Sequence, residues 1–295
     1  MKHAYLIIAH KNDYTLQILL KLIDDERNDI FIHMDRKNQK YEFEIIKKYV
    51  KKSKIYQIEN RNNVVWGDYS QIDTELILLE LAIKTGKYDF YHLLSGEDLP
   101  LKSQDYIHKF FDENKGEEFV RFEKINFSYN DRVSQYHLFQ RLIGKPNSHP
   151  FLYSLNYRFL KLQKIFGIRR NKDIQFQKGA NWFSITDDLA RLVISKKEWI
   201  EKIFKFTVCC DEVFLQTIIN QTEFKNRLYH KKYDNDLHSI MRLIDWERGT
   251  PYIFKIEDKK MLTETDMLFA RKFDCNMDRE IIDYISQYIL GKNIK

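Results

Sequence analysis

The stretch from Tyr91 to Ser103, YHLLSGEDLPLKS, constrains the fold more than any other part of this sequence. Aromatic and aliphatic residues run up to Leu94 and stop at Ser95-Gly96, and two carboxylates, Glu97 and Asp98, follow. This pattern predicts a buried strand that runs into a tight polar turn. In open α/β sheets, ligands bind outside the carboxyl ends of the strands. The turn therefore marks a sheet edge where we expect a binding site.

Further strands and helices alternate along the first hundred residues. Residues 4–9 and 30–34 are continuous apolar runs, as is typical of strands buried on both faces. Residues 14–23 and 70–84 carry apolar side chains at helical spacing, with Ser70 placed as an N-cap. This alternation predicts an α/β fold with a mostly parallel sheet flanked by helices. Other expected elements are strands at 54–58, 63–66, 88–94 and 179–185, helices at 41–50, 187–194 and 211–220, and an apolar turn at 268–273.

Polar or charged turns end three of the expected strands, at His10-Lys11, Asp35-Arg36 and Glu97-Asp98. These turns should meet at one edge of the sheet, where a nucleotide or sugar-nucleotide fits. A flavodoxin-like or plain Rossmann domain explains the pattern equally well. No GxGxxG follows the first strand, which disfavours a dinucleotide.

Composition limits the compartment and the partners. With 43% hydrophobic residues, 9 Gly and 4 Pro in 295 residues, we expect a single folded domain without long linkers. The cysteines, Cys209, Cys210 and Cys275, are odd in number and lack metal-ligand spacing, which favours a reducing compartment. No signal-peptide pattern and no apolar run of roughly 18 residues is present, so we expect a cytoplasmic protein. The net charge of +6 is scattered along the chain, and we expect no nucleic-acid partner.

Four pairs of sequence blocks, in the right order, resemble the core-2/I-branching N-acetylglucosaminyltransferase family, which also includes peptide xylosyltransferases. The resemblance covers residues 3–275. It implies a GT-A type, Rossmann-like fold and an inverting transfer of a sugar from a UDP-sugar to a hydroxyl, without a metal ion or other cofactor. The blocks are AYLIIAHKN (4–12) with FIHMD (31–35), VVWGDYSQI (64–72) with YHLLSGEDLPLKS (91–103), KGANWFSIT (178–186) with CCDEVFLQTII (209–219), and LIDW (243–246) with LFARKFD (268–274).

The resemblance also assigns roles to individual residues. Glu212 matches the general base, and Lys272, with Arg271 beside it, matches a ligand of the nucleotide phosphates. A second phosphate-binding arginine of the family has Arg248 as its nearest counterpart, a few residues early. The other matches are two uridine contacts and one residue of the acceptor pocket: Asp35, Trp66 and Trp246.

The chemistry of inversion agrees with a single base. One carboxylate takes the proton of the acceptor hydroxyl, and the leaving UDP departs as an anion that needs no proton. Glu212 stands beside Asp211 at the start of the expected helix 211–220, although acids there are also ordinary helix starters. Arg132 and Tyr136 lie in an aromatic-rich segment, and we expect them to contact the acceptor.

The turn at residues 95–98 indicates whether the reaction needs a metal ion. Metal-dependent relatives of the fold use an Asp-x-Asp at this place, where this chain reads Ser-Gly-Glu-Asp. Glu97 and Asp98 carry oxygen atoms suited to Mg²⁺ or Mn²⁺. Because the first Asp is missing, we expect Asp98 to have a structural role at the nucleotide-sugar site and Lys272 with Arg271 to replace the metal.

The sequence thus predicts one glycosyltransferase domain over residues 1–295, with a nucleotide-binding half (1–110), an acceptor and catalytic half (111–275) and a C-terminal helix (276–295). The favoured reaction moves N-acetylglucosamine to a saccharide or lipid-linked saccharide in bacterial surface polysaccharide synthesis. Such an enzyme would associate peripherally with the cytoplasmic face of the inner membrane. The alternatives are a xylosyl or other UDP-sugar transferase, or a carbohydrate- or nucleotide-binding module without turnover.

Overall fold

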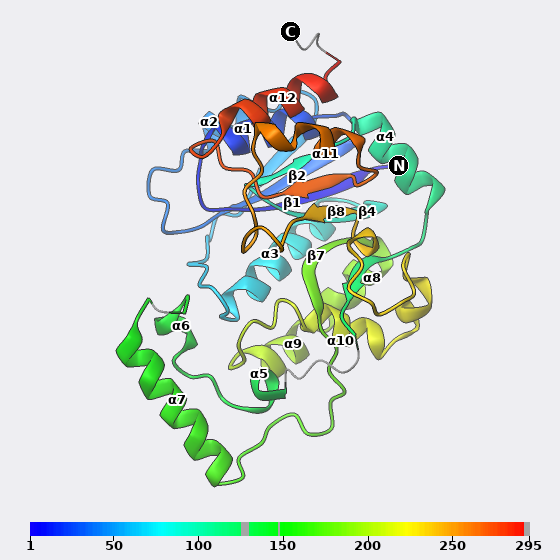
Figure 1. Ribbon diagram of the computed structural model, residues 1–295. Coiled ribbons are helices and arrows are strands. Elements are labelled where there is room, and N and C mark those ends of the chain that lie inside the picture. Colours follow the sequence, from blue (N-terminus) through cyan, green and yellow to red (C-terminus); the bar gives the residue numbers. More distant parts are fainter. Residues whose placement is uncertain (125–129, 147, 292–295) are drawn as a thin grey trace.

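A six-stranded sheet with the strand order β3-β2-β1-β4-β7-β6 forms the centre of the computed structural model, which describes residues 1–124, 130–146 and 148–291 (Figure 1). The first four strands in this order are parallel, and β7 and β6 continue the sheet antiparallel. The strands are β1 (His3–Ala9), β2 (Asn28–Met34), β3 (Lys54–Gln57), β4 (Phe90–Ser95), β6 (Phe119–Phe122) and β7 (Gly179–Thr186).

Both faces of the sheet are buried, which explains the continuous apolar runs. Along β1, Ala4 and Leu6 pack into one hydrophobic cluster, while Tyr5 and Ile7 pack into the other. The first cluster is covered by α3 (Ser70–Thr85), α8 (Asp187–Ser195), α9 (Lys197–Phe204) and α10 (Phe214–Asn220). The second is covered by α1 (Tyr14–Ile23), α2 (Phe43–Lys47), α4 (Gln104–Glu113), α11 (Lys259–Glu264) and α12 (Arg279–Ile289).

A second, three-stranded sheet brings the C-terminal part of the chain to the polar turn after β4. Its order is β5-β9-β8, with β5 (Asp98–Pro100), β8 (Arg242–Ile244) and β9 (Phe269–Arg271). Asp98 pairs with Arg271 in this sheet, and Leu99 pairs with Ala270. The apolar turn expected at 268–273 is therefore wrong, because β5 supplies a partner strand for residues 269–271.

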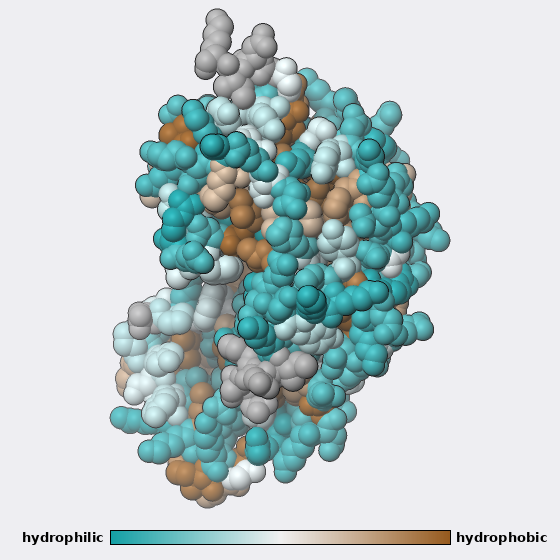
Figure 2. All heavy atoms as spheres, turned by 45° about the vertical axis from the view of Figure 1, so that its right-hand side comes forward, coloured by the Kyte–Doolittle hydropathy of each residue, from teal (hydrophilic) through white to brown (hydrophobic). Residues whose placement is uncertain are grey.

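The segment with α5 (Asn130–Ser134), α6 (Gln140–Ile143) and α7 (Pro150–Ile165) leaves these layers, and α7 stands apart from both sheets (Figure 1). It contacts α6 and the backbone of Tyr136, to which Gln163 is hydrogen-bonded twice. Figure 2 shows a largely hydrophilic surface on which apolar side chains gather at the lower end of the molecule, over the lower end of α7.

The expected α/β fold with a mostly parallel, helix-flanked sheet in one domain is confirmed, and the arrangement is the one that the GT-A expectation requires. Helix 14–23 has the predicted bounds, but the helix expected at 41–50 covers only residues 43–47. The C-terminal helix covers 279–289, and residues 292–295 of the expected range lie outside the described residues. In the part of the chain that the structure describes, no helix combines the length and the apolar character that a membrane crossing requires.

Three further predictions are wrong, at residues 63–66, at Ser70 and at residues 211–213. Residues 63–66 form no strand, because the amide of Val65 donates to the hydroxyl of Ser70 and its carbonyl accepts from Asp68. Ser70 is consequently the first residue of α3 and not its N-cap. Helix 211–220 begins only at Phe214, because the preceding residues form a turn closed on the carbonyl of Cys210.

Candidate functional site

A cavity of about 670 Å³ opens at the carboxyl ends of β1, β2 and β4. Its walls come from the turns after these strands, from the start of α3, from β7 and from the end of β9. The turns predicted to meet at one sheet edge do so here, since His10, Asp35 and Glu97 all line it. Three residues matched to the nucleotide-sugar site, Asp35, Trp66 and Arg271, are also part of this lining.

Asp35 and Trp66 belong to one end of the cavity. Asp35 is buried and accepts a hydrogen bond from the backbone amide of Lys37 at 2.8 Å, which fixes its carboxylate at the end of β2. Trp66 is 43% exposed, although its backbone carbonyl is held by the Gln140 side chain at 2.9 Å. A fixed carboxylate and an accessible aromatic ring can bind the polar edge and the flat face of a base.

Glu97 is the centre of a cluster of cations. Its Oε2 lies 2.8 Å from Nζ of Lys272, and its Oε1 lies 3.5 Å from Nζ of Lys11 and 3.7 Å from Nε2 of His10. Partial burial lowers the pKa of His10 despite the neighbouring carboxylate, so His10 is neutral at pH 7. Lys11 and Lys272 therefore carry the positive charge of the cluster.

Asp98 and Arg271 form a second acid–cation pair beside this cluster. The carboxylate of the buried Asp98 accepts from the amide of Ser95 at 2.8 Å and from its hydroxyl at 2.7 Å, and lies 3.4 Å from Nη1 of Arg271. Burial raises the pKa of Asp98, against the influence of Arg271. The Arg271 guanidinium stacks on Trp182 at 4.2 Å, and its Nη1 has no hydrogen-bond partner among the described residues. Since Arg271 lines the cavity, its guanidinium contributes positive charge there.

Glu212 lies in the turn before α10, where two cations contact the same carboxylate oxygen. Nη1 of Arg132 is 3.0 Å and Nζ of Lys178 is 3.4 Å from its Oε2. The ion pairs among the described residues leave Oε1 unused, and the side chain is 37% exposed. Both cations thus hold one oxygen, and the partly exposed carboxylate is placed to accept a proton.

Two buried carboxyl groups connect Glu212 to the cavity. Asp211 accepts a hydrogen bond from the Gln71 side chain at 2.9 Å, and Gln71 and Glu75 both line the cavity from α3. Burial, and then the charge of Glu212, raises the pKa of Asp211 to about 7. Burial also raises the pKa of Glu75 well above its usual value. Both shifts favour the neutral form of Asp211 and Glu75.

The sequence matches the Core-2/I-Branching enzyme family over residues 3–267. This chain belongs to that family. The expectation of a glycosyltransferase is thereby confirmed at the level of the family.

Among the curated proteins, xylosyltransferase 2 of Homo sapiens is 21% identical over 305 residues, which cover 98% of this chain and 34% of that protein. Xylosyltransferase oxt of Drosophila pseudoobscura is 22% identical over 92% of this chain and 31% of its own length. The chain thus spans about a third of the length of these relatives. A solved structure, 4-diphosphocytidyl-2C-methyl-D-erythritol synthase from Anaerococcus prevotii, aligns with a TM-score of 0.36 at 13% identity over 89% of this chain and 95% of that one, a likeness too weak to carry an argument.

Six residues assigned to the donor or acceptor site from the sequence are absent from the cavity lining. Two of them, Lys272 and Asp98, pair with the lining residues Glu97 and Arg271. The other four lie elsewhere. Arg248 is bound by Asp245 at 2.5 Å and Asp258 at 2.7 Å, and it stacks on Tyr252. Trp246 is 54% exposed in the neighbouring loop. Tyr136 stacks under Arg170 at 4.7 Å, and Arg132 contacts Glu212. Contacts of these two residues with an acceptor stay predictions.

Several residues of the site were not assigned a role from the sequence. Lys11, Gln71, Lys178 and Trp182 each lie inside a block that carries the family resemblance, so position within a block was the available signal. Glu75 lies outside these blocks, and an acidic residue in an amphipathic helix is normally expected on the solvated face.

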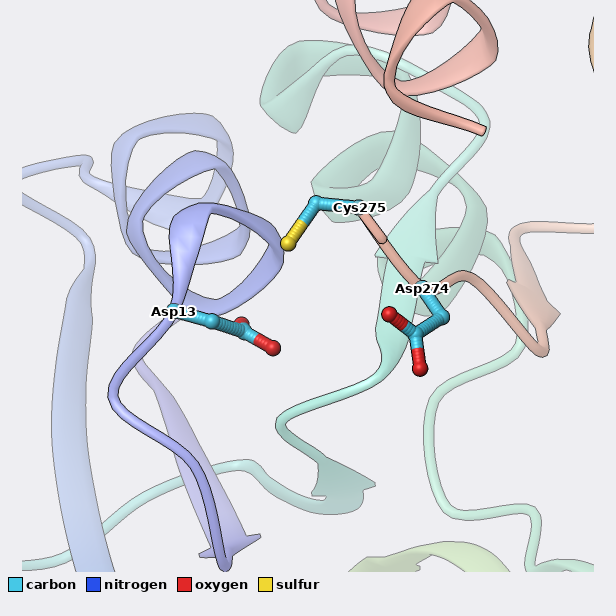
Figure 3. Close-up of side chains that lie close together, drawn as sticks. All are labelled: Asp13, Asp274 and Cys275. Carbon is cyan, nitrogen blue, oxygen red and sulfur yellow. The ribbon is translucent and has the colours of Figure 1, made fainter. Parts of the chain in front are cut away.

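One group among the described residues has donor atoms close enough to hold a metal ion: Asp13, Asp274 and Cys275 (Figure 3). Asp13 accepts from the amide of Leu16 as the N-cap of α1, and Asp274 lies 3.0 Å from Nζ of Lys11. Both carboxylates therefore already have partners. Glu97 and Asp98, the ligands considered from the sequence, each face a cation.

Proposed function

We propose that this chain transfers a sugar from a UDP-sugar to a hydroxyl of a saccharide acceptor, with inversion and without a metal ion. The observation that carries the proposal is the pairing of the two acids of the turn with Lys272 and Arg271, in which Glu97 and Arg271 line the cavity and Asp98 and Lys272 lie beside them. The place at which a divalent cation would bind a diphosphate thus has fixed organic cations. Such cations stabilise a leaving diphosphate as a metal would.

The proposed reaction uses Glu212 as the base. Its Oε1 accepts the proton of the acceptor hydroxyl while the hydroxyl oxygen forms a bond to the anomeric carbon. The bond from that carbon to the β-phosphate oxygen breaks at the same time, and its electron pair leaves with UDP. Lys272 and Arg271 bind the charge that develops on the departing diphosphate.

The donor sugar is a separate part of the proposal. The family resemblance favours N-acetylglucosamine, whereas the matching curated relatives are named xylosyltransferases, which favours xylose as the second candidate. A saccharide or lipid-linked saccharide acceptor, bacterial surface polysaccharide synthesis and a cytoplasmic location agree with this activity and remain proposals with it.

Release of UDP from a panel of UDP-sugars, with and without saccharide acceptors, tests the proposal. We expect acceptor-dependent release from UDP-N-acetylglucosamine or UDP-xylose that persists in EDTA. If UDP binds but no donor is turned over with any acceptor, the chain is a nucleotide- or carbohydrate-binding module. Strict dependence on Mn²⁺ would contradict the metal-free mechanism and return Glu97 and Asp98 to the role of ligands.

A further inference from the structure

Helix α7 differs from an ordinary surface helix in the side chains that it buries and exposes. Its two buried residues, Asn156 and Gln163, are polar, and Gln163 bonds both backbone groups of Tyr136. Surface helices normally bury an apolar stripe and expose their polar face. Leu152, Phe159 and Leu160 are half-buried beside these two residues, and Phe159 packs on Phe139. The other apolar side chains of α7 are left exposed.

The exposed apolar side chains form a stripe that Arg158 interrupts at its middle. The spacing of Phe151, Leu155, Leu162, Ile165 and Phe166 places them on one side of the helix and of the turn that follows it. Phe151 is 79% exposed, Ile165 68% and Phe166 73%. Figure 2 shows an apolar patch at the lower end of the molecule, bordered by hydrophilic surface. Clustered exposed apolar residues of this kind mark an interaction surface.

The same segment is strongly basic. Residues 132–172 contain nine Lys and Arg and no Asp or Glu. Exposed cations beside the stripe include Arg158, Lys161 and Arg169. Lys164, also exposed, pairs with Asp131 at 2.6 Å.

The combination of these two features identifies the partner. A second copy of this chain would present the same uncompensated positive charge, so charge disfavours self-association through α7. A nucleic acid would bind the cations but would leave the apolar stripe in water. We propose that α7 docks on the surface of an anionic lipid bilayer, with the stripe inserted among the acyl chains and the lysines and arginines at the headgroups.

Residues 132–145, which precede α7 in the chain, also contact the candidate site. Gln140 of α6 holds the carbonyl of Trp66, Gly144 and Lys145 line the cavity, and Arg132 contacts Glu212. Docking through α7 would hold the cavity near the bilayer, where a lipid-linked acceptor would lie. The docking surface itself lies outside the cavity and does not rest on the transfer reaction.

Flotation of the full chain with lipid vesicles tests the inference. We expect binding to phosphatidylcholine vesicles that contain about 30% phosphatidylglycerol, weaker binding to pure phosphatidylcholine, and partial release as salt is raised. Arg158→Gln with Lys161→Gln should lower the partition coefficient about 30-fold, since each cation contributes a factor of about five. Phe151→Ser with Leu162→Ser should lower it at least about tenfold.

Matched variants at distant exposed positions are the controls. Lys109→Gln with Lys260→Gln removes the same charge from α4 and α11, and Leu290→Ser removes an exposed apolar side chain at the end of α12. We expect neither control to change flotation by more than about twofold. All of these positions are exposed, so the variants should fold, and circular dichroism checks this.

The inference is overturned if the chain does not float with anionic vesicles at low salt, or if the α7 variants and the controls behave alike. A dimer in light scattering that Phe151→Ser abolishes, without vesicle binding, would assign the stripe to a second copy. Binding of RNA with no flotation would assign the cations to nucleic acid. UDP release on a water-soluble acceptor, measured in parallel, reports the reaction independently of docking.

Discussion

Replacing Glu212 by Gln separates catalysis from folding at the proposed base. The amide keeps the size of the carboxylate but cannot accept the acceptor proton as a base. A positioned general base contributes about 10²- to 10⁴-fold to the rate, or about 2.7 to 5.5 kcal/mol in the activation free energy. The side chain is 37% exposed, so water screens its ion pairs with Arg132 and Lys178, and losing each costs at most about 1 kcal/mol of stability. We expect at least about a hundredfold loss of transfer in a folded protein.

The assay is UDP release at saturating donor and acceptor, combined with calorimetric binding of UDP to the same variant. UDP affinity should stay within about threefold of the unmodified chain, because Glu212 does not take part in phosphate binding. Glu123→Gln is the matched control. Glu123 also pairs with Lys178, so its replacement disturbs the same lysine without removing the base. For this control we expect a loss below about tenfold.

Two results would refute the reasoning. Transfer by the Glu212→Gln variant within about tenfold of the unmodified chain would mean that another group takes the proton. An equal loss in Glu123→Gln would mean that the position of Lys178, and not the base, limits the reaction. A loss of UDP binding in either variant would show that the change reaches the donor cavity.

Other predictions concern the donor cations, the metal and the buried acid. Lys272→Ala and Arg271→Ala should each weaken UDP binding about 10- to 100-fold by calorimetry, whereas Arg248→Ala, outside the cavity, should change it less than about threefold. Transfer should be unchanged after dialysis against EDTA, and activity that only Mn²⁺ restores would contradict this. Because the pKa of Asp211 is raised to about 7, its contribution to stability is full below about pH 4 and is lost as the pH rises to 7. The free energy of unfolding should therefore fall between about pH 4 and 7 in chemical denaturation, and Asp211→Asn should flatten this dependence.

The parts of the fold that were predicted correctly follow from local patterns. Strands buried on both faces must be apolar at every position, so residues 4–9 and 30–34 could be recognised without any knowledge of their neighbours. Helix 14–23 repeats apolar residues at helical spacing, and Asp13 caps it. In these segments the local pattern and the tertiary environment agree.

The errors arose where distant residues decide the local structure. The side chain of Ser70 and a turn at Asp68 hold residues 63–66 out of any sheet, although the sequence there is rich in valine. Residues 269–271 form a strand because β5, about 170 residues earlier in the chain, lies beside them. A local sequence pattern does not show which distant strand will pair with a segment. The family blocks show only that both segments are present in the chain.

The same limit applies to the site. The base could be matched from its block, but its cation Arg132 lies 80 residues earlier in a segment without block similarity, and its role as an acceptor contact was inferred from composition alone. Arg248 was selected by its nearness to the matched position, and only its ion pairs with Asp245 and Asp258 place it outside the cavity. The position of a residue in the sequence does not determine where its side chain points in the fold.

The acidic turn after β4 positions two cations, of which the sequence predicted the presence but not the arrangement. Its two carboxylates separate the two cations of the C-terminal segment, since Glu97 binds Lys272 while Asp98 binds Arg271. Asp98 is fixed by Ser95 and by the pairing of β5 with β9, so the position of Arg271 follows from the sheet. Glu97 shares its charge among several cations, so a donor diphosphate can compete for Lys272 without leaving Glu97 unpaired. In the proposed reaction, the two cations held by this turn have the role that a metal ion would otherwise have beside the diphosphate.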